Sequence, residues 1–510
     1  MKRFILLIYT LCCFVGYSFA NDIQQAYSAF EMIEEKGVYV DEINLTNLKS
    51  FPIGLHKTIG NTPVTLAISN VIFHNGYAEI DIYAKVVMPQ NVVLCFGAQK
   101  IKFSYNGSFI GNVKFALLED LELPAFSDNS LKLIFRGGSN RYLDAEDLSF
   151  ATISCKGIEE FGLAIDAEFS DKFIVPVDKN GEIIVGEKLR TSFSTTASDL
   201  DDILVKVNLP AFAVNGLDGY SFACENVVFD YSLIKHEQEV KFPNDYQQNF
   251  FPECNIKMWR GFYAKNISVT LPSCFKEKDS NKKLSFATNH LIIDEYGLSG
   301  LFKADIPILS IEKGDASGWN FSVNRFALAL EANQLTEASF GGEIGIPVSD
   351  SLNSTLEYTG LFDVYNNYYL SVEVKDSLSF DILSARASIR DESYLKLQVK
   401  DKQFRPEALL HGNLNIKVKD KKSSEDSKVK MSGIEFQSLK IQTEIPYFSA
   451  DYLGYKGSGS ITGIPIYLDK LYLSSDANYV KLGCGIGIEL GGIVSGKTDF
   501  TIRSKTSYEN

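Results

Sequence analysis

Apolar and polar residues alternate along most of the chain from residue 64 onward. Runs of about five to ten residues rich in Val, Ile, Phe and Tyr recur, and short turn-like segments separate them. The run 77–86, YAEIDIYAKV, shows the pattern. Because successive side chains of a strand point to opposite faces of a sheet, such a run places one row in the core and the other in water. The pattern predicts a mainly β protein.

One helix is expected, over residues 21–36. Its apolar residues recur at helical spacing: Ile23, Ala26, Tyr27, Phe30 and Ile33. Asn21 or Asp22 can cap its start, and Gly37 can end it. The sequence therefore predicts a short N-terminal helix, followed by a linker that reaches residue 61.

Asn-Gly pairs separate several of the strand-like runs. Three of them, at 75–76, 106–107 and 180–181, lie directly between such runs, and a fourth, at 215–216, lies in a looser Gly-rich loop. Asn-Gly favours tight hairpins in which both turn residues have a positive φ. These pairs predict antiparallel sheets.

The chain contains phrases that occur more than once. Segment 221–230, SFACENVVFD, matches segment 285–294, SFATNHLIID, and Ser149-Phe150-Ala151 opens a weaker third copy. Each copy follows a Leu-Pro segment, at 123–126, 209–212 and 271–275. The pattern predicts an elongated antiparallel β-sandwich or β-repeat architecture, in which each unit completes the core of its neighbour. Chance similarity among strand-rich segments is the alternative.

A second phrase, GGEIGIP at 341–347, is echoed by GSITGIP at 459–465. Glycine permits a bulge, and proline lacks the N–H of a ladder hydrogen bond, so each phrase is predicted to end a strand. Two charged stretches of mixed sign, 276–283 and 417–430, are predicted to be solvated hairpin loops rather than binding patches. The second is also a candidate module boundary.

A chain of 510 residues is longer than one hydrophobic core usually supports. The expected division is a signal peptide at 1–20, the helix and linker at 21–61, β modules at 62–200 and 311–420, a β-repeat module at 201–310, and a C-terminal β module at 421–510.

The first twenty residues have the layout of a cleavable signal peptide. Lys2 and Arg3 precede an apolar run from Phe4 to Tyr17, and Ser18-Phe19-Ala20 supplies small residues at the exit. The residues before Cys12 and Cys13 do not suit a lipoprotein cleavage site, so release is expected. No later stretch approaches eighteen consecutive apolar residues, and no transmembrane helix is predicted.

The charge balance argues against nucleic acid as a partner. The formal net charge is −14, and loss of Lys2 and Arg3 with the signal peptide makes it −16. Such a surface repels nucleic-acid phosphates and anionic lipid headgroups.

Six cysteines remain after cleavage, too few for a scaffold built on disulfides. Cys254 and Cys274 flank one strand-like segment and form the best candidate pair. Buried, unpaired cysteine is the alternative for all six.

No catalytic residue, metal ligand or cofactor-binding residue is assigned. His236-Glu237 begins like a zinc-protease helix motif, but Val240 stands where the second histidine should be. Ser139 lies in a Gly-rich turn with no base marked for it, and His290 is expected to be a strand side chain. The glycine-rich phrases at 457–463 and 483–492 lack the lysine of a phosphate loop, and the second suits a strand with one small-residue face.

Two further kinds of site have alternatives that stay open. Acidic residues at Asp199, Asp201 and Asp202, and the phrase Asp178–Gly181, resemble parts of calcium loops, with a plain turn or solvated loop as the alternative. Trp259 and Trp319 could stack on sugars or be buried in the core. The 64 carboxylates could also hide the catalytic pair of a carbohydrate-active hydrolase.

The repeated Ser-Phe-Ala and Gly-Ile-Pro phrases, together with the signal peptide, are similar to long secreted β-repeat proteins of Gram-negative bacteria with no assigned activity. The resemblance runs from about residue 62 to the end. It implies a noncatalytic structural or binding protein, secreted or at the cell surface, with a protein or glycan partner; this chain would be a shortened member or a fragment. The irregular repeats also resemble AsmA-like groove proteins, which implies the alternative of a periplasmic lipid carrier.

Overall fold

The computed structural model describes most of the chain between residues 24 and 505. The segments outside the description are 1–23, 43–50, 60–61, 88–92, 106–108, 127, 139–146, 155–156, 198–201, 233–239, 244–245, 251–258, 279, 281, 347–354, 366, 374–377, 381–384, 401, 419–428, 462, 477–478, 491–493 and 506–510. The predicted signal peptide thus lies outside the described residues.

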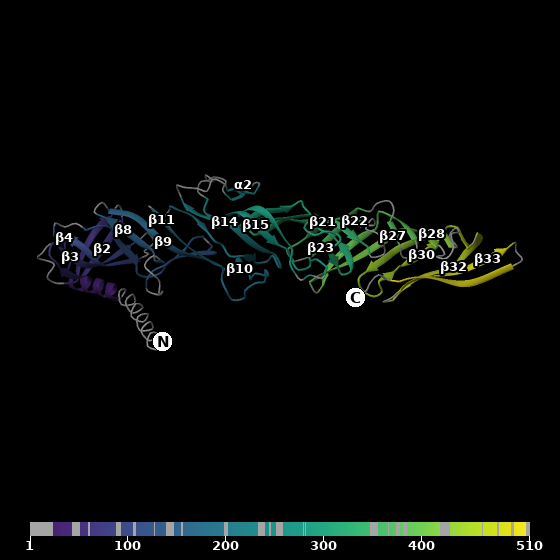
Figure 1. The fold of residues 1–510 in the computed structure, drawn as a ribbon, viewed down its shortest axis with the longest axis horizontal. Helices are drawn as coiled ribbons and strands as arrows, with labels where there is room; N and C mark the ends of the chain where they lie inside the picture. Colours follow the sequence, from purple (N-terminus) through teal and green to yellow (C-terminus); the bar gives the residue numbers. More distant parts are fainter. Residues whose placement is uncertain are drawn as a thin grey trace, which may run out of the picture.

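Three antiparallel sheets follow one another along a rod (Figure 1). The first contains β1 (Ile53–Ile59), β2 (Thr62–Phe73), β3 (Tyr77–Val87), β4 (Val93–Ser104), β5 (Val113–Leu117), β6 (Leu121–Pro124), β7 (Leu131–Phe135), β8 (Phe150–Ser154), β9 (Gly157–Phe169) and β11 (Arg190–Ala197). The expectation of a mainly β, antiparallel fold with a short N-terminal helix is confirmed.

The second sheet occupies the middle of the rod. It contains β10 (Ile174–Pro176), β12 (Asp202–Val207), β13 (Phe212–Val214), β14 (Ser221–Ser232), β15 (Gly261–Thr270), β16 (Ser285–Asp294), β17 (Gly297–Ala304), β18 (Asp315–Ala316), β19 (Trp319–Phe321), β20 (Arg325–Glu331), β21 (Gln334–Gly345), β22 (Thr355–Phe362) and β23 (Tyr368–Glu373). The short helix α2 (Tyr246–Phe250) lies in the connection from β14 to β15.

The third sheet forms the C-terminal end of the rod (Figure 1). It contains β24 (Leu378–Phe380), β25 (Ala385–Ile389), β26 (Tyr394–Lys400), β27 (Gln403–Val418), β28 (Val429–Gln442), β29 (Phe448–Ser449), β30 (Tyr452–Tyr455), β31 (Gly459–Ile461), β32 (Ile464–Ser475), β33 (Tyr479–Leu490) and β34 (Val494–Lys505).

The N-terminal helix spans residues 24–36 and covers one face of the first sheet. Its buried residues, Ala26, Ala29, Phe30 and Ile33, pack against Ala67, Tyr83, Cys95 and Leu118. Gly37 ends the helix with a φ of +63°, as its sequence position predicts. Tyr27 differs from the expectation, because its side chain is 43% exposed and its hydroxyl donates to Glu119 Oε2 at 3.0 Å.

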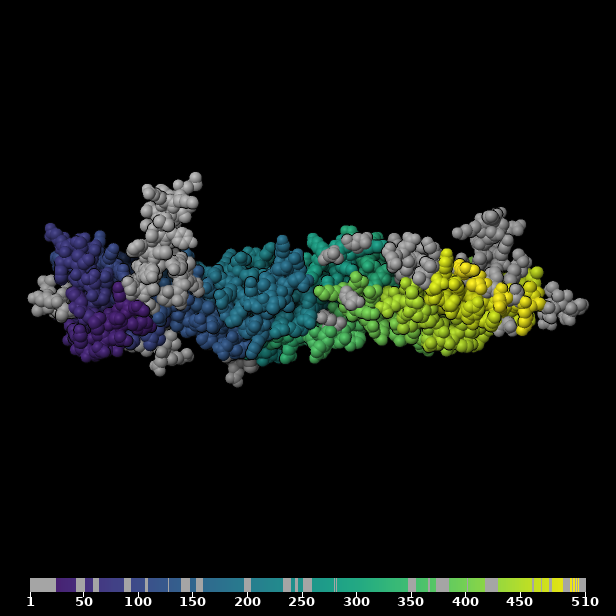
Figure 2. Space-filling model, turned by 90° about the horizontal axis from the view of Figure 1, so that it is seen from below, coloured from purple at the N-terminus to yellow at the C-terminus, as the bar shows by residue number. Residues whose placement is uncertain are grey.

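One hydrophobic core runs through all three sheets. A single cluster of buried residues extends from Leu94 in the first sheet to Ile486 in the third. Aromatic rings join the sheets: the Phe169 and Phe262 centroids are 5.1 Å apart, and the Phe404 ring of the third sheet lies 4.9 Å from that of Phe275, in the connection between β15 and β16 of the second. Figure 2 accordingly shows an unbroken body along the long axis.

The sheet boundaries differ in part from the expected modules. The first sheet ends at Ala197, close to the expected boundary at 200. The expected boundary at 310 falls inside the second sheet, and that at 420 falls between β27 and β28, which pair with each other. At the ends of the charged stretch 417–430, Lys417 pairs with Lys430 and Val418 with Val429, whereas residues 419–428 lie outside the described part of the chain. Stretch 276–283 also closes on itself, through a bridge between Lys276 and Lys283.

The two matching phrases occupy matching places in the second sheet. They form β14 and β16, which pair with opposite sides of β15. Asn226 and His290, at the same position of the phrase, both have a positive φ, and each lies opposite Lys265 without any shift of the register. The phrases are thus two strands that share one partner within a sheet, rather than two stacked units. The weaker third copy begins β8 in the first sheet.

The two Gly-Ile-Pro phrases are not equivalent in the structure. The first ends β21 at Gly345, as predicted. In the second, β31 ends at Ile461, and a turn at Gly463 and the start of β32 follow within the same phrase, where Pro465 pairs with Ser460. A proline two residues into a strand is tolerated where its nitrogen needs no ladder bond.

Asn-Gly pairs do mark turns, but by a different turn geometry from the one expected. Gly76, Gly181 and Gly216 have positive φ, whereas the asparagines before them do not. The turn at 75–76 connects β2 to β3, which supports the antiparallel prediction. The pair at 106–107 lies outside the described residues.

Candidate functional site

Strands β32, β33 and β34 present tyrosines and basic side chains on one solvent-exposed face at the yellow end of the rod (Figure 1). Their register places a common set of exposed or half-buried side chains on this face: Tyr467, Lys470, Tyr472, Tyr479, Lys481, Lys497, Asp499 and Arg503. We call this set the tyrosine–lysine face. The opposite face of β33 is core, where Val480, Leu482, Cys484 and Ile486 are buried.

A bulge in β32 creates the face. Tyr467 and Tyr472 are five residues apart, so strict alternation would place them on opposite sides of the sheet. The register shifts between Leu468 and Lys470, so that one extra residue, Asp469, stands in β32. The shift brings both tyrosines to the same side.

Glycines of β33 lie beneath the two tyrosine rings. Tyr472 is opposite Gly483, and Tyr467 is opposite Gly487. The point that a Cβ of Gly483 would occupy is 2.0 Å from Cζ of Tyr472, with Cε1 at 2.3 Å and the hydroxyl at 2.4 Å. These three similar distances mean that the ring turns its flat face to the glycine. Gly487 and Tyr467 show the same arrangement, with 2.0 Å to Cζ.

Two rings in the core of the other sheets form the same cross-strand pair and are covered. Phe340 lies over Gly360 in the second sheet, and Tyr83 lies beside Gly97 in the first. Both of those rings are 1% exposed. Tyr467 and Tyr472, in contrast, are 40% and 46% exposed. The C-terminal sheet therefore uses a packing arrangement of the core but leaves the outer ring faces open to solvent.

Aromatic and basic side chains alternate along the middle of this face. Tyr479, Lys481, Tyr472, Lys470 and Tyr467 follow in this order along β33, because the β32 side chains lie over its glycines. Successive tyrosines stand four β33 residues apart, which corresponds to roughly 13 Å. Lys470 Nζ lies 3.1 Å from Asp499 Oδ2, and Lys481 Nζ lies 2.8 Å from Asp476 Oδ2 at the hairpin.

The face is basic although the chain is acidic. Lys470, Lys481, Lys497 and Arg503 carry positive charge, and Asp499 is the acidic member of the face. The whole chain has a formal net charge of −14. The four basic side chains outnumber Asp499 and the neighbouring Asp476, so the local charge is opposite in sign to the net charge of the chain.

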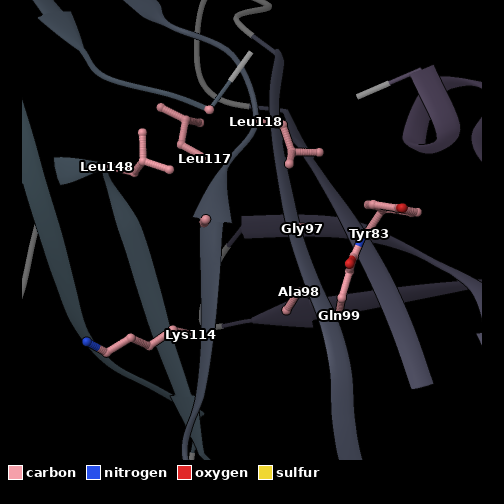
Figure 3. Close-up of a pocket in the computed structure, with 10 residues that line it drawn as sticks. Tyr83, Gly97, Ala98, Gln99, Lys114, Leu117, Leu118 and Leu148 are labelled. Carbon is pink, nitrogen blue, oxygen red and sulfur yellow. The ribbon is translucent and has the colours of Figure 1, made fainter. Parts of the chain in front are cut away.

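A small cavity lies between β4 and β5, near the N-terminal helix (Figure 3). These strands pair at only two positions before they part, and the small residues Gly97, Ala98, Ala116 and Gly138 leave about 200 Å³ between them. Leu117, Leu118 and Leu148 form an apolar wall, and Lys114 stands at the other side. Ligand pockets usually exceed about 300 Å³, so this volume suits solvent or a small fragment.

A buried carboxylate lies beneath the connection from β14 to β15. Asp294 Oδ2 accepts hydrogen bonds from the Tyr246 hydroxyl at 2.7 Å and from Trp259 Nε1 at 2.8 Å. Burial raises the pKa of Asp294, and these hydrogen bonds oppose the rise only in part. Tyr246, Trp259, Tyr263 and Ile292 form a small cluster of their own around it. The arrangement fixes the connection onto the sheet, and Asp294 is a structural residue.

The residues weighed from the sequence lie mostly in structural positions. Trp259 and Trp319 are buried, at 3% and 0% exposure, so their stacking on a sugar is excluded. Asp178 caps a turn, with Oδ1 accepting from the backbone of Asn180 and Glu182, and these hydrogen bonds lower its pKa. His290 lies on β16, as expected.

Several other candidates fall outside the description: Ser139, Asp199, Asp201, His236, Glu237 and Cys254. Cys274 is a free cysteine in the core, and burial raises its pKa to about 12. Over the described part of the chain, no group of His, Cys, Asp and Glu is arranged to hold a metal ion. Among the helices described, none is long and apolar enough to cross a membrane.

The tyrosine–lysine face was not among the sites considered from the sequence. The available signal was the alternation of glycine with larger residues over 483–488, which indicates a strand with one small-residue face, and β33 confirms it. No family model matches this chain, and no curated protein or solved structure is similar to it.

Proposed function

We propose that this protein is an exported, noncatalytic rod that presents the tyrosine–lysine face to a partner at the cell surface. The observation that carries the proposal is the open stacking of Tyr467 and Tyr472 on glycine. The protein itself covers the equivalent rings of Phe340 and Tyr83, whereas the rings of Tyr467 and Tyr472 are open to another molecule. Tyrosine is well suited to this, because it offers contact area and a polar tip at a low cost in side-chain entropy.

The position of the face also supports the proposal. It lies at the far end of the rod from the N-terminal helix (Figure 1), and the continuous core holds it there. The signal peptide expected at residues 1–20 would deliver such a rod out of the cytoplasm.

The close packing of side chains inside the rod favours this function over the lipid-carrying alternative. An open groove would expose apolar side chains along its length, but the interior positions are occupied by rings in mutual contact. Phe404, for example, packs against Phe275, Phe321 and Tyr368 at centroid distances of 4.9, 5.3 and 5.2 Å. An acyl chain would have to displace these rings.

Binding to the envelope of the producing cell tests the proposal. Purified, labelled residues 21–510 are added to intact cells, together with the variant Y467A/Y472A and the control Y369A/Y394A, whose exposed tyrosines lie elsewhere. We expect the wild type and the control to bind and the face variant to lose most binding. Equal binding by all three proteins, stoichiometric lipid in native mass spectrometry, or turnover of a glycan substrate would contradict it.

A further inference from the structure

The tyrosine–lysine face has the chemistry of a binding surface for an acidic polysaccharide, and we propose that its ligand is a glycan chain bearing carboxylate or other anionic groups. This inference rests on the proposed function and names the partner of the same site. The way in which the sheet holds the two rings, and not only their exposure, supports this assignment.

The rings are preorganised for stacking. Each of the Tyr467 and Tyr472 rings has its inner face on a glycine backbone, so it cannot rotate inward, and it presents the outer face to solvent. A pyranose ring has flat apolar C–H faces that pack on such a surface, while its hydroxyls remain at the edges. Little side-chain freedom is lost on binding because the rings are already fixed.

Charge on the face selects an anionic ligand. Lys470 and Lys481 stand between the tyrosines, and Lys497 and Arg503 follow along β34. A polymer that alternates ring faces with negative groups would meet tyrosine and basic side chains in turn along β33. The acidic remainder of the chain repels such a polymer, so the electrostatic attraction is confined to this end.

The geometry disfavours the other anionic partners. A membrane surface is usually engaged by aromatic side chains that project into it, whereas these rings lie flat against the sheet. Single-stranded nucleic acid stacks successive bases on closely spaced rings, and here the tyrosines are separated by roughly 13 Å with a lysine between them. An acidic peptide would use the lysines but would gain nothing from the flat rings.

Fluorescence titration of residues 21–510 with polygalacturonate tests the inference, because the probe combines pyranose rings with carboxylates. We expect saturable binding that weakens with salt. Y467A/Y472A should weaken it about tenfold or more, whereas Y467F/Y472F should retain most of it, because phenylalanine keeps the stacking face. The charge reversal K497E/R503E should weaken it as well, while a neutral β-glucan should bind less tightly than polygalacturonate.

Three other anionic probes distinguish a glycan ligand from an acidic peptide, a membrane surface and a nucleic acid. Equal or tighter binding of polyglutamate, phosphatidylglycerol vesicles or oligothymidylate, with the same dependence on the two tyrosines, would overturn the assignment to a glycan. Absence of polygalacturonate binding, while binding to cells still requires Tyr467 and Tyr472, would overturn this inference alone and leave the proposed function standing. Each variant is compared with wild type by circular dichroism, and K497E/R503E tests the charge of the face without replacing either tyrosine.

Discussion

The phenol ring of Tyr472 lies face-down on the backbone of Gly483, the residue directly opposite it on β33. A Cβ at that glycine would stand 2.0 Å from the ring carbon Cζ, which is closer than two non-bonded carbon atoms can approach. The glycine is thus required by the tyrosine rather than by the backbone.

This relationship predicts that the effect of G483A changes sign with its partner. With Tyr472 present, the added methyl group expels the ring and lowers stability. In the Y472A background the same replacement removes the entropic cost of glycine in a strand, about 0.5–1 kcal/mol, and raises stability. Calorimetry of the four proteins measures the coupling, and additive effects would contradict the stacking.

Asp294 predicts an unusual dependence of stability on pH. Burial raises its folded pKa above the unfolded value, so the ionised carboxylate lowers stability at neutral pH, and this penalty disappears as the pH falls through the folded pKa. The stability of wild type relative to D294N should therefore increase on acidification from pH 7. Thermal unfolding of both proteins over a pH series measures it, and a constant difference would refute the assignment.

Glu168 provides the matched control of opposite sign. Burial works to raise its pKa, but hydrogen bonds and charges from Lys188 and Arg190 outweigh it and lower the pKa. Its stabilising contribution is present above the unfolded pKa, about 4.3, and is lost as the pH falls through the folded value. The advantage of wild type over E168Q should accordingly shrink in acid.

The positive φ of Asn226 in β14 predicts a stabilising substitution. Asn226 is exposed and has a φ of +54°, a conformation that costs a side-chain-bearing residue up to about 1 kcal/mol. N226G should raise stability by up to that amount. The control N266G, on the neighbouring strand β15 and without a positive φ, should lower it by about 0.5–1 kcal/mol. Chemical denaturation measures both, and a loss in both would argue against a left-handed conformation at Asn226.

The packing of Phe404 leads to a prediction about how much the junction between the second and third sheets contributes to stability. Its ring is 1% exposed and packs against Phe275, Phe321 and Tyr368 from the second sheet. F404A should lower the unfolding free energy by about 3–5 kcal/mol, whereas Y365A, at a side chain 82% exposed, should change it by less than about 0.5 kcal/mol. Urea denaturation measures both, and a small loss in F404A would mean that the sheets are only loosely joined.

Most of the fold could be predicted from local patterns in the sequence. The helix over 24–36 was predictable because the spacing of Ala26, Phe30 and Ile33 and the glycine after it act within a few residues. The match between 221–230 and 285–294 also corresponded to real equivalence, down to the positive φ at the sixth residue. The grouping into three sheets was not predictable, because it depends on which strands pair at a distance.

The candidate site escaped prediction for a physical reason. Its two tyrosines share a face only because Asp469 is an extra residue in β32, and one inserted residue reverses the alternation from which faces are predicted. Such single-residue shifts are set by the partner strand, and composition does not record them.

The continuity of the core has a mechanical consequence. A chain whose modules are joined by linkers swivels at each joint, and the reach of its tip varies from moment to moment. Here Phe169 and Phe404 make ring contacts at the two junctions, so that over the described residues one continuous core joins the first sheet to the last. Under the proposed function such a rod would be a spacer of fixed length, which would hold whatever binds its tip at a constant height above whatever anchors its base.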